Sequence, residues 1–169
     1  MHYAILSATG ADRPGLLDEI SQFLLERQGK IEDIRVANLG GQFAFLARLS
    51  GSEAALAHVK RDIGQLAHAS RIHVDLHAHR DGQHGPVDGF PFRFRATVTD
   101  QAVAMQRISH LMRVLNINID DIKTRAAQNG HFELELRLSV PRETPVTMLR
   151  DYLQHLCGEM QVQWNLDPA

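Results

Sequence analysis

The sequence of 169 residues predicts an α+β fold made of two ferredoxin-like units, each with the element order β-α-β-β-α-β. Segments in which apolar residues alternate, as on half-buried strands, flank segments with apolar residues at helical spacing. The sequence also repeats itself at an offset of 88 positions, or 89 farther along. Ile31-Glu32-Asp33-Ile34 aligns with Ile119-Asp120-Asp121-Ile122, and Arg48-Leu49-Ser50 aligns with Arg137-Leu138-Ser139. We expect each unit to form an antiparallel four-stranded sheet with two helices on one face.

Residues 1–80 contain the first set of elements and form the first predicted domain. Ala4, Leu6 and Ala8 alternate with other residues, as on a strand. Gly40-Gly41 separates two such segments and is typical of a tight hairpin. Ser52 is a favourable N-cap for the second helix. The predicted elements are strands at residues 3–9, 30–39, 42–49 and 72–78, and helices at residues 14–28 and from residue 52 onward.

Residues 81–91 are rich in glycine and proline and lack periodicity, which predicts a linker between two domains. Residues 92–169 then repeat the order of the first unit and form the second predicted domain, in which Asn129-Gly130 marks the hairpin. The predicted elements are strands at residues 92–98, 116–125, 131–140 and 161–166, and helices at residues 101–115 and 145–157.

The overall composition excludes several classes of protein. The net charge is −2 and the pI is near 6.5, so no basic field favours direct binding to nucleic acid. The single cysteine, Cys157, fits a reducing cytoplasm and a place in the core. We find no signal peptide and no apolar run of the roughly 20 residues that a membrane span needs. We therefore expect a cytoplasmic protein that does not bind membranes.

The loop between the first strand and the first helix is the most informative segment of the chain. It reads Gly10-Ala11-Asp12-Arg13-Pro14-Gly15-Leu16. The N-terminus of a helix presents unpaired N–H groups to which a carboxylate can bind. Glycines allow a ligand or another backbone to come close, and Pro14 suits the first helical position. The alternative is a well-formed turn that binds no ligand.

A β-α-β-β-α-β unit that opens with a strand and Gly-x-Asp-Arg-Pro-Gly-Leu resembles the ACT domain, a regulatory module for amino acids and related small metabolites. The run Gly40-Gly41-Gln42-Phe43-Ala44 strengthens this resemblance, which extends over nearly the whole chain as two tandem units. It implies regulatory binding, with neither catalysis nor a cofactor. The ligand-binding residues that it implies are Gly10, Ala11, Asp12, Arg13, Pro14, Gly15 and Leu16.

The resemblance also implies what binds to this loop. The ligand would be glycine or a similar amino acid, with its carboxylate at the helix N-terminus and its ammonium at Asp12. In the alternative, Asp12 accepts hydrogen bonds only from amides of its own loop. Tandem ACT proteins of this kind suggest regulation of glycine cleavage or amino-acid metabolism. This chain would act through a transcription factor or other partner protein, and as a homodimer.

The second unit departs from the loop motif. Asp100-Gln101-Ala102-Val103 stands in place of Asp-Arg-Pro-Gly, and Val98 takes the position of Gly10. Asp100 can still cap the helix, but the backbone without these glycines is less open to a ligand. We therefore expect a ligand-competent first domain and a second domain with a degenerate loop.

Histidines on the last strand of the first unit suggest a second hypothesis, a metal-binding protein. His73, Asp75, His77 and His79 alternate along this strand, so their side chains project from one sheet face. Neighbours two apart on a strand are about 7 Å apart, so a pair of them could chelate one ion only with strain. The competing interpretation is a solvent-facing or interface strand without metal.

Motifs of common enzymes are absent from the sequence, among them Gly-x-Ser-x-Gly, the phosphate-binding loop and His-Glu-x-x-His. The acidic pairs Glu32-Asp33 and Asp120-Asp121 lie on strands, where successive side chains face opposite ways. They cannot form a close acid–base couple. The sequence thus predicts a binding protein that is not an enzyme.

Overall fold

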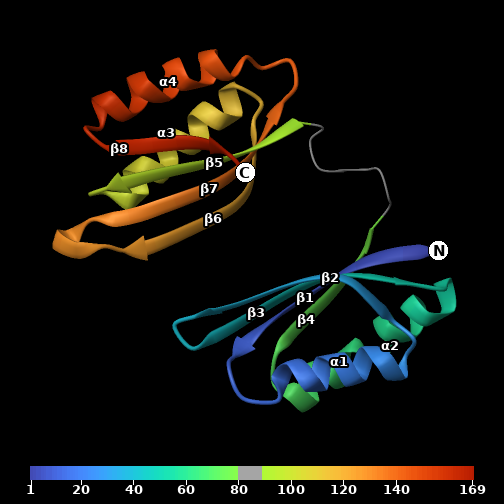
Figure 1. Cartoon of the computed structure of the whole chain (residues 1–169). Helices are drawn as coiled ribbons and strands as arrows, with labels where there is room; N and C mark the ends of the chain where they lie inside the picture. The colour runs from blue at the N-terminus through green and yellow to red at the C-terminus, as the bar shows by residue number, and fades with distance from the viewer. Residues whose placement is uncertain (80–88) are drawn as a thin grey trace. The chain divides into compact units, whose positions relative to one another are not determined.

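Each half of the chain folds into one antiparallel four-stranded sheet with two helices on one face, as the sequence predicts (Figure 1). The coordinates are a computed structural model that describes residues 1–79 and 89–169, apart from the side chain of residue 128. The chain divides into Met1–Gln83 and His84–Ala169, here called unit 1 and unit 2. The strand orders β2-β3-β1-β4 and β6-β7-β5-β8 are equivalent, which confirms the duplicated ferredoxin-like topology.

The elements follow the predicted order in both units. Unit 1 contains β1 (His2–Ala11), α1 (Leu16–Glu26), β2 (Lys30–Leu39), β3 (Gln42–Gly51), α2 (Glu53–Ser70) and β4 (His73–His79). Unit 2 contains β5 (Gly89–Val98), α3 (Gln101–Val114), β6 (Asn118–Ala126), a 3-10 turn (Gln128–Gly130), β7 (Phe132–Pro141), α4 (Val146–Glu159) and β8 (Gln163–Pro168). In the described part of the chain, no helix is long and apolar enough to cross a bilayer.

The core of each unit lies between its sheet and its two helices. In unit 1, Leu6 and Leu49 from the sheet and Ile20 from α1 are fully buried. In unit 2, Phe94 and Cys157 are fully buried. Burial raises the pKa of the Cys157 thiol to about 11, so at neutral pH it stays a protonated core residue. Because side chains alternate along strands, the opposite face of each sheet remains open.

Both predicted hairpins use backbone conformations that suit glycine. Gly40 and Gly41 have φ of 58° and 78° between β2 and β3. Asn129 and Gly130 have φ of 61° and 74° between β6 and β7. Positive φ at two central residues matches the twist of antiparallel strands, which explains the Gly-Gly and Asn-Gly signals in the sequence.

A matched β-bulge sets the register in both sheets. The pairing of β2 with β3 shifts between Ile31 and Asp33, so Glu32 is the extra residue. Its carboxylate accepts a hydrogen bond from Ser50 Oγ at 2.5 Å. In unit 2 the shift leaves Asp120 extra, and this carboxylate accepts from Ser139 Oγ at 2.7 Å. The first acid of each acidic pair is therefore a bulge residue with a serine partner.

The predicted linker, residues 81–91, falls outside the described residues as far as residue 88. Gly89, Phe90 and Pro91, which the sequence assigned to that linker, belong instead to β5. A Cβ at Gly89 would lie 2.3 Å from the carbonyl oxygen of Val140 on β7, so glycine permits a close pairing of strands here. The carbonyl of Pro91 accepts a hydrogen bond at 3.0 Å from the backbone N–H of Ala169, the residue that follows β8. Gly89 and Pro91 are therefore strand residues and do not form a turn.

Two glycines of unit 1 allow a test of this packing. A Cβ at Gly10 would lie 2.6 Å from Cγ2 of Ile72, whereas one at Gly64, inside α2, would meet no atom within 4 Å. We expect Gly10→Ala to lower the free energy of unfolding by about 1–3 kcal/mol because it overpacks the core. Gly64→Ala should raise it by about 0.5–1 kcal/mol. Urea unfolding of both variants measures the two effects, and equal midpoints would contradict the packing at Gly10.

Candidate functional site

The loop of residues 10–16 contains a β-turn immediately before α1. The carbonyl of Arg13 accepts a hydrogen bond from Leu16 N at 3.4 Å. Pro14 and Gly15 are the central residues of this turn, and Gly15 has φ 87° and ψ −10°. These are the values of the third residue of a type II turn, which favours proline before it and glycine at this position. Pro14 therefore lies in the turn and not at the first helical position, and α1 begins two residues later than predicted, at Leu16.

The N-terminus of α1 lacks a side-chain cap. Gly15 is its N-cap, and no side chain of the described residues forms a capping hydrogen bond there. The other unit differs: at the equivalent helix α3, Asp100 accepts from Val103 N at 3.0 Å. The first-turn N–H groups of a helix have no acceptor within the helix itself. In α1, Leu16 N donates to the carbonyl of Arg13 and Glu19 N donates to that of Gly15 at 3.0 Å. The N–H groups of Leu17 and Asp18 form no hydrogen bond among the described residues, so they are available to an external acceptor, and the positive end of the helix dipole favours an anion.

Asp12 ties the loop to the β2–β3 hairpin. Its backbone N–H donates to the carbonyl of Gly41 at 2.9 Å, and its carboxylate accepts from the side-chain amide of Asn38 on β2. The sequence left open whether Asp12 bonds only to its own loop. The partner of its carboxylate is instead Asn38, 26 residues away in the sequence. Asp12 is exposed, so its carboxylate also remains open to solvent.

Arg13 ties the same loop to both helices. Its guanidinium forms two hydrogen bonds of 2.7 Å with the carboxylate of Glu19 on α1, which also accepts from Ser70 Oγ of α2 at 2.7 Å. The bonds from Arg13 and Ser70 lower the pKa of Glu19 to about 2, and the bond to Glu19 raises the pKa of Arg13. Arg13 is therefore already paired within the protein.

The remaining residues of the predicted site are either packed against the core or exposed. Gly10 faces Ile72, and Leu16 is buried in the core, where it anchors the start of α1. Ala11 and Pro14 are exposed. The seven predicted residues are thus divided between the end of β1 (Gly10 and Ala11), the turn (residues 12–15) and the start of α1 (Leu16). Their hydrogen bonds add three residues that the sequence did not indicate. These three are Glu19, Asn38 and Ser70.

The equivalent loop of unit 2 is closed in a different way. Val98, in the position of Gly10, is buried at the end of β5. The carboxylate of Asp100 occupies the N-terminus of α3 through the bond to Val103. In unit 2 the side chain of Asp100 therefore caps the N-terminus of α3, whereas no side chain of the described residues caps the equivalent N-terminus of α1 in unit 1.

The histidine strand lies on the open face of the unit 1 sheet, as expected from the alternation. His73, Asp75, His77 and His79 pair with Thr9, Ser7, Ile5 and Tyr3 of β1. Within this set, Nε2 of His77 lies 2.9 Å from Oδ2 of Asp75. No group of three or more His, Cys, Asp or Glu residues in the described part of the chain is arranged to hold a metal ion. The geometry does not favour the metal-binding hypothesis.

Comparison with known proteins matches the fold and the loop to one family. A family model described as "ACT domain" covers residues 2–77, which include the whole loop. The N-terminal unit matches the ACT-domain model over nearly its whole length. The resemblance to tandem ACT-domain proteins that the sequence predicts is thereby confirmed, and it extends to unit 2 through the relatives of the whole chain.

The chain is similar over nearly its full length to the glycine cleavage system transcriptional repressor of Escherichia coli (strain K12) and to that of Shigella flexneri. The identity to each is 23% over 171 residues, with 98% of this chain and 90% of the relative covered. A crystal structure of a protein to which the same repressor function is ascribed has a TM-score of 0.79 at 18% identity and covers 98% of this chain and 96% of its own. An unknown protein from Galdieria sulphuraria has a TM-score of 0.78 at 17% identity, with 99% and 98% covered. These structures show the fold.

The Glu19 carboxylate predicts a dependence of stability on pH. Its pKa falls from 4.5 to about 2 on folding, so its contribution is complete above pH 4.5 and is lost as the pH falls towards 2. The difference in unfolding free energy between the wild type and Glu19→Gln should therefore shrink as the pH is lowered from about 5 to about 3. Urea unfolding at several pH values measures it. Glu143→Gln, which alters a side chain without a partner among the described residues, is the control, and parallel curves for both variants would contradict the assignment.

Proposed function

We propose that this protein is an amino-acid-responsive regulator whose ligand binds in unit 1, at the loop of residues 10–16. The observation that carries the proposal is the uncapped N-terminus of α1, held open by the Pro14-Gly15 turn inside an ACT domain. Backbone N–H groups at a helix N-terminus bind carboxylates through hydrogen bonds and the helix dipole. A free amino acid supplies such a carboxylate.

Within this proposal the loop residues have distinct roles. The ligand carboxylate accepts from the N–H groups of Leu17 and Asp18 in the first turn of α1, and Gly15 supplies the backbone conformation that leaves them accessible. The ligand ammonium pairs with the exposed carboxylate of Asp12. Arg13 acts as a positioning residue, because its guanidinium is bound to Glu19. Glycine or a similarly small amino acid fits a site that is formed mainly by backbone.

We propose further that the protein regulates glycine cleavage or amino-acid metabolism at the level of transcription. The matched relatives in Escherichia coli and Shigella flexneri carry the name of a transcriptional repressor of the glycine cleavage system. The net charge of −2 does not favour direct binding to DNA, so the effect on transcription would pass through a partner such as a transcription factor. The exposed edge strand β2, with Val36 49% and Leu39 75% exposed, supports a homodimer.

Calorimetric titration of the full chain with glycine and other small amino acids tests the site. Gly15→Val should weaken binding at least tenfold, because φ 87° is strained for a β-branched residue and the turn would change. Asp100→Ala, which removes the side-chain cap of the equivalent helix in unit 2, is the matched variant and should leave the affinity unchanged. Circular dichroism confirms that both variants fold.

Two results would refute this assignment. One is unchanged binding by Gly15→Val together with loss of binding by Asp100→Ala. The other is the absence of any stabilisation in a thermal-shift screen, since a ligand that binds the native state must raise the unfolding temperature by mass action.

A further inference from the structure

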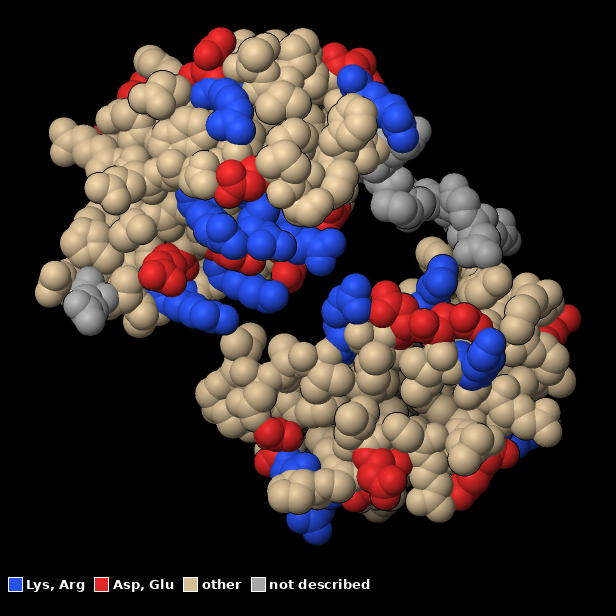
Figure 2. Space-filling view, viewed as in Figure 1, with Lys and Arg blue, Asp and Glu red and all other residues tan. Residues whose placement is uncertain are grey.

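The open face of the unit 2 sheet carries charged and polar side chains in register across all four strands. Figure 2 shows Lys and Arg gathered on the face of this unit that is turned away from α3 and α4. Residues that pair between neighbouring strands project from the same face, so the pairing defines two rows across the sheet. The first row is Gln163, Thr97, Glu133 and Arg125, and the second row is Asn165, Arg95, Glu135 and Lys123, each in the strand order β8-β5-β7-β6.

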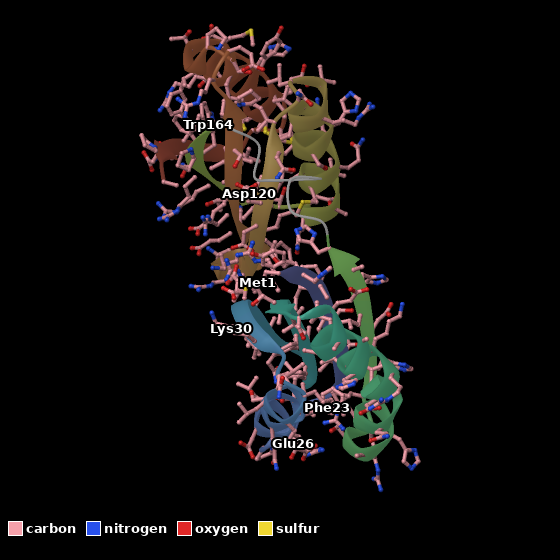
Figure 3. All side chains as sticks on the ribbon, turned by 90° about the vertical axis from the view of Figure 1, so that its right-hand side faces the viewer. Met1, Phe23, Glu26, Lys30, Asp120 and Trp164 are labelled. Atoms are coloured by element: carbon pink, nitrogen blue, oxygen red, sulfur yellow. The ribbon has the colours of Figure 1, made fainter. Side chains whose placement is uncertain are left out.

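These two rows line a hollow of about 450 Å³. Ala96, Leu134 and Trp164 complete its lining, and Figure 3 marks Trp164 on β8. Hollows of roughly 300–1,000 Å³ are of the size that small ligands occupy. The hollow lies entirely within unit 2, so it is formed without the ligand loop of unit 1.

The two rows differ in how their side chains are paired. In the second row, Arg95 lies 2.8 Å from Glu135, and Lys123 lies 3.6 Å from Asp121. Asn165 donates to Asp167 at 2.8 Å. The hydrogen bond from Arg95 is the main cause of a lowered pKa at Glu135. Within the second row, Arg95 and Glu135 therefore neutralise each other, whereas Lys123 and Asn165 contact residues outside the row.

The first row has no such bonds. Among the described residues, the side chains of Arg125, Glu133, Thr97 and Gln163 form neither a hydrogen bond nor an ion pair. Arg125 and Glu133 are opposite each other in the register of β6 and β7, yet their charged groups do not come within the 4.0 Å of an ion pair. A guanidinium, a carboxylate, a hydroxyl and an amide therefore line the hollow side by side, exposed to solvent and without a side-chain partner among the described residues.

The charges of the hollow indicate the chemistry of a ligand. Three cations, Arg95, Lys123 and Arg125, face two carboxylates, Glu133 and Glu135, so the lining has one net positive charge. A ligand with one ammonium and two carboxylates has the complementary charge. Lys123 and Arg125 are two residues apart on β6, at about 7 Å, a separation that two carboxylates of one small molecule can bridge.

We propose that this hollow binds a small amino dicarboxylate, of the class of L-aspartate and L-glutamate. Arg125 binds one carboxylate through a bidentate pair of hydrogen bonds from its guanidinium, and the ammonium group of Lys123 binds the second carboxylate. Glu133 accepts hydrogen bonds from the ammonium, while Thr97 and Gln163 bind the polar edge of the ligand. The site goes beyond the proposed function of the loop and does not depend on it, because the loop belongs to unit 1.

Calorimetric titration of the full chain with L-glutamate tests this site. Arg125→Gln should weaken L-glutamate binding at least tenfold. Glu133→Gln should weaken L-glutamate binding to a similar degree but should not weaken binding of glutarate, which has both carboxylates and no ammonium. Arg113→Gln on α3 and Glu143→Gln before α4 are matched charge controls away from the sheet face and should bind L-glutamate as the wild type does.

Each titration is repeated in the Gly15→Val background. This substitution weakens binding at the loop of unit 1, so the L-glutamate binding that remains is assigned to unit 2. Persistence of L-glutamate binding in that background, with loss on Arg125→Gln, supports the site whether or not the loop binds glycine. The proposal is overturned if the wild type does not bind L-glutamate. Wild-type affinity in folded Arg125→Gln and Glu133→Gln variants would overturn it as well, as would equal binding of L-lysine.

Discussion

Each sheet is covered by helices on only one face, and this constraint organises the whole molecule. Because side chains alternate along a strand, every second residue in the middle of the inner strands β1, β3, β5 and β7 is apolar and buried, while the residues between them face away from the helices. A slip of one residue would exchange the two sets completely. The bulge residues Glu32 and Asp120, each bonded to a serine of the adjacent strand, occupy equivalent positions in the two units. They shift the pairing of β2 with β3 and of β6 with β7 by one residue at the same point of each sheet.

The two units share this framework and differ in their loops and in the open faces of their sheets. Both units have the same strand order and the same bulge, because a change in either would disturb the core. The loops and open faces carry no such penalty, and there the units differ. Unit 1 has a type II turn and an uncapped helix, whereas Asp100 caps the equivalent helix in unit 2. The open face of unit 1 presents Ile5 and Leu46 at its centre, whereas that of unit 2 presents paired and unpaired charges.

Local patterns made much of this architecture predictable from the sequence. Gly40-Gly41 predicted a hairpin correctly because positive φ is a property of the residues themselves. The start of α1 was predicted two residues early, since proline suits both the first position of a helix and the second position of a turn. Gly89 and Pro91 were assigned to a linker because their strand role depends on Val140 and Ala169. The contact between Glu19 and Ser70, 51 residues apart, leaves no local signal at all.

The contacts of the loop explain how a ligand there can influence the rest of unit 1. Asp12 bonds to Asn38 on the edge strand β2, and Arg13 bonds through Glu19 to the end of α2. Asp12, Arg13 and Asn38 are exposed, so their bonds alone contribute little, but together with the buried Ser70 they hold the turn in one conformation. A ligand ammonium at Asp12 competes with Asn38 for the same carboxylate. If the loop binds a ligand as we propose, its occupancy is coupled to the contact between the loop and β2, an edge strand of the sheet. A ligand that binds the two states of this contact with different affinity shifts the population between them, which is the minimum that a regulatory domain requires.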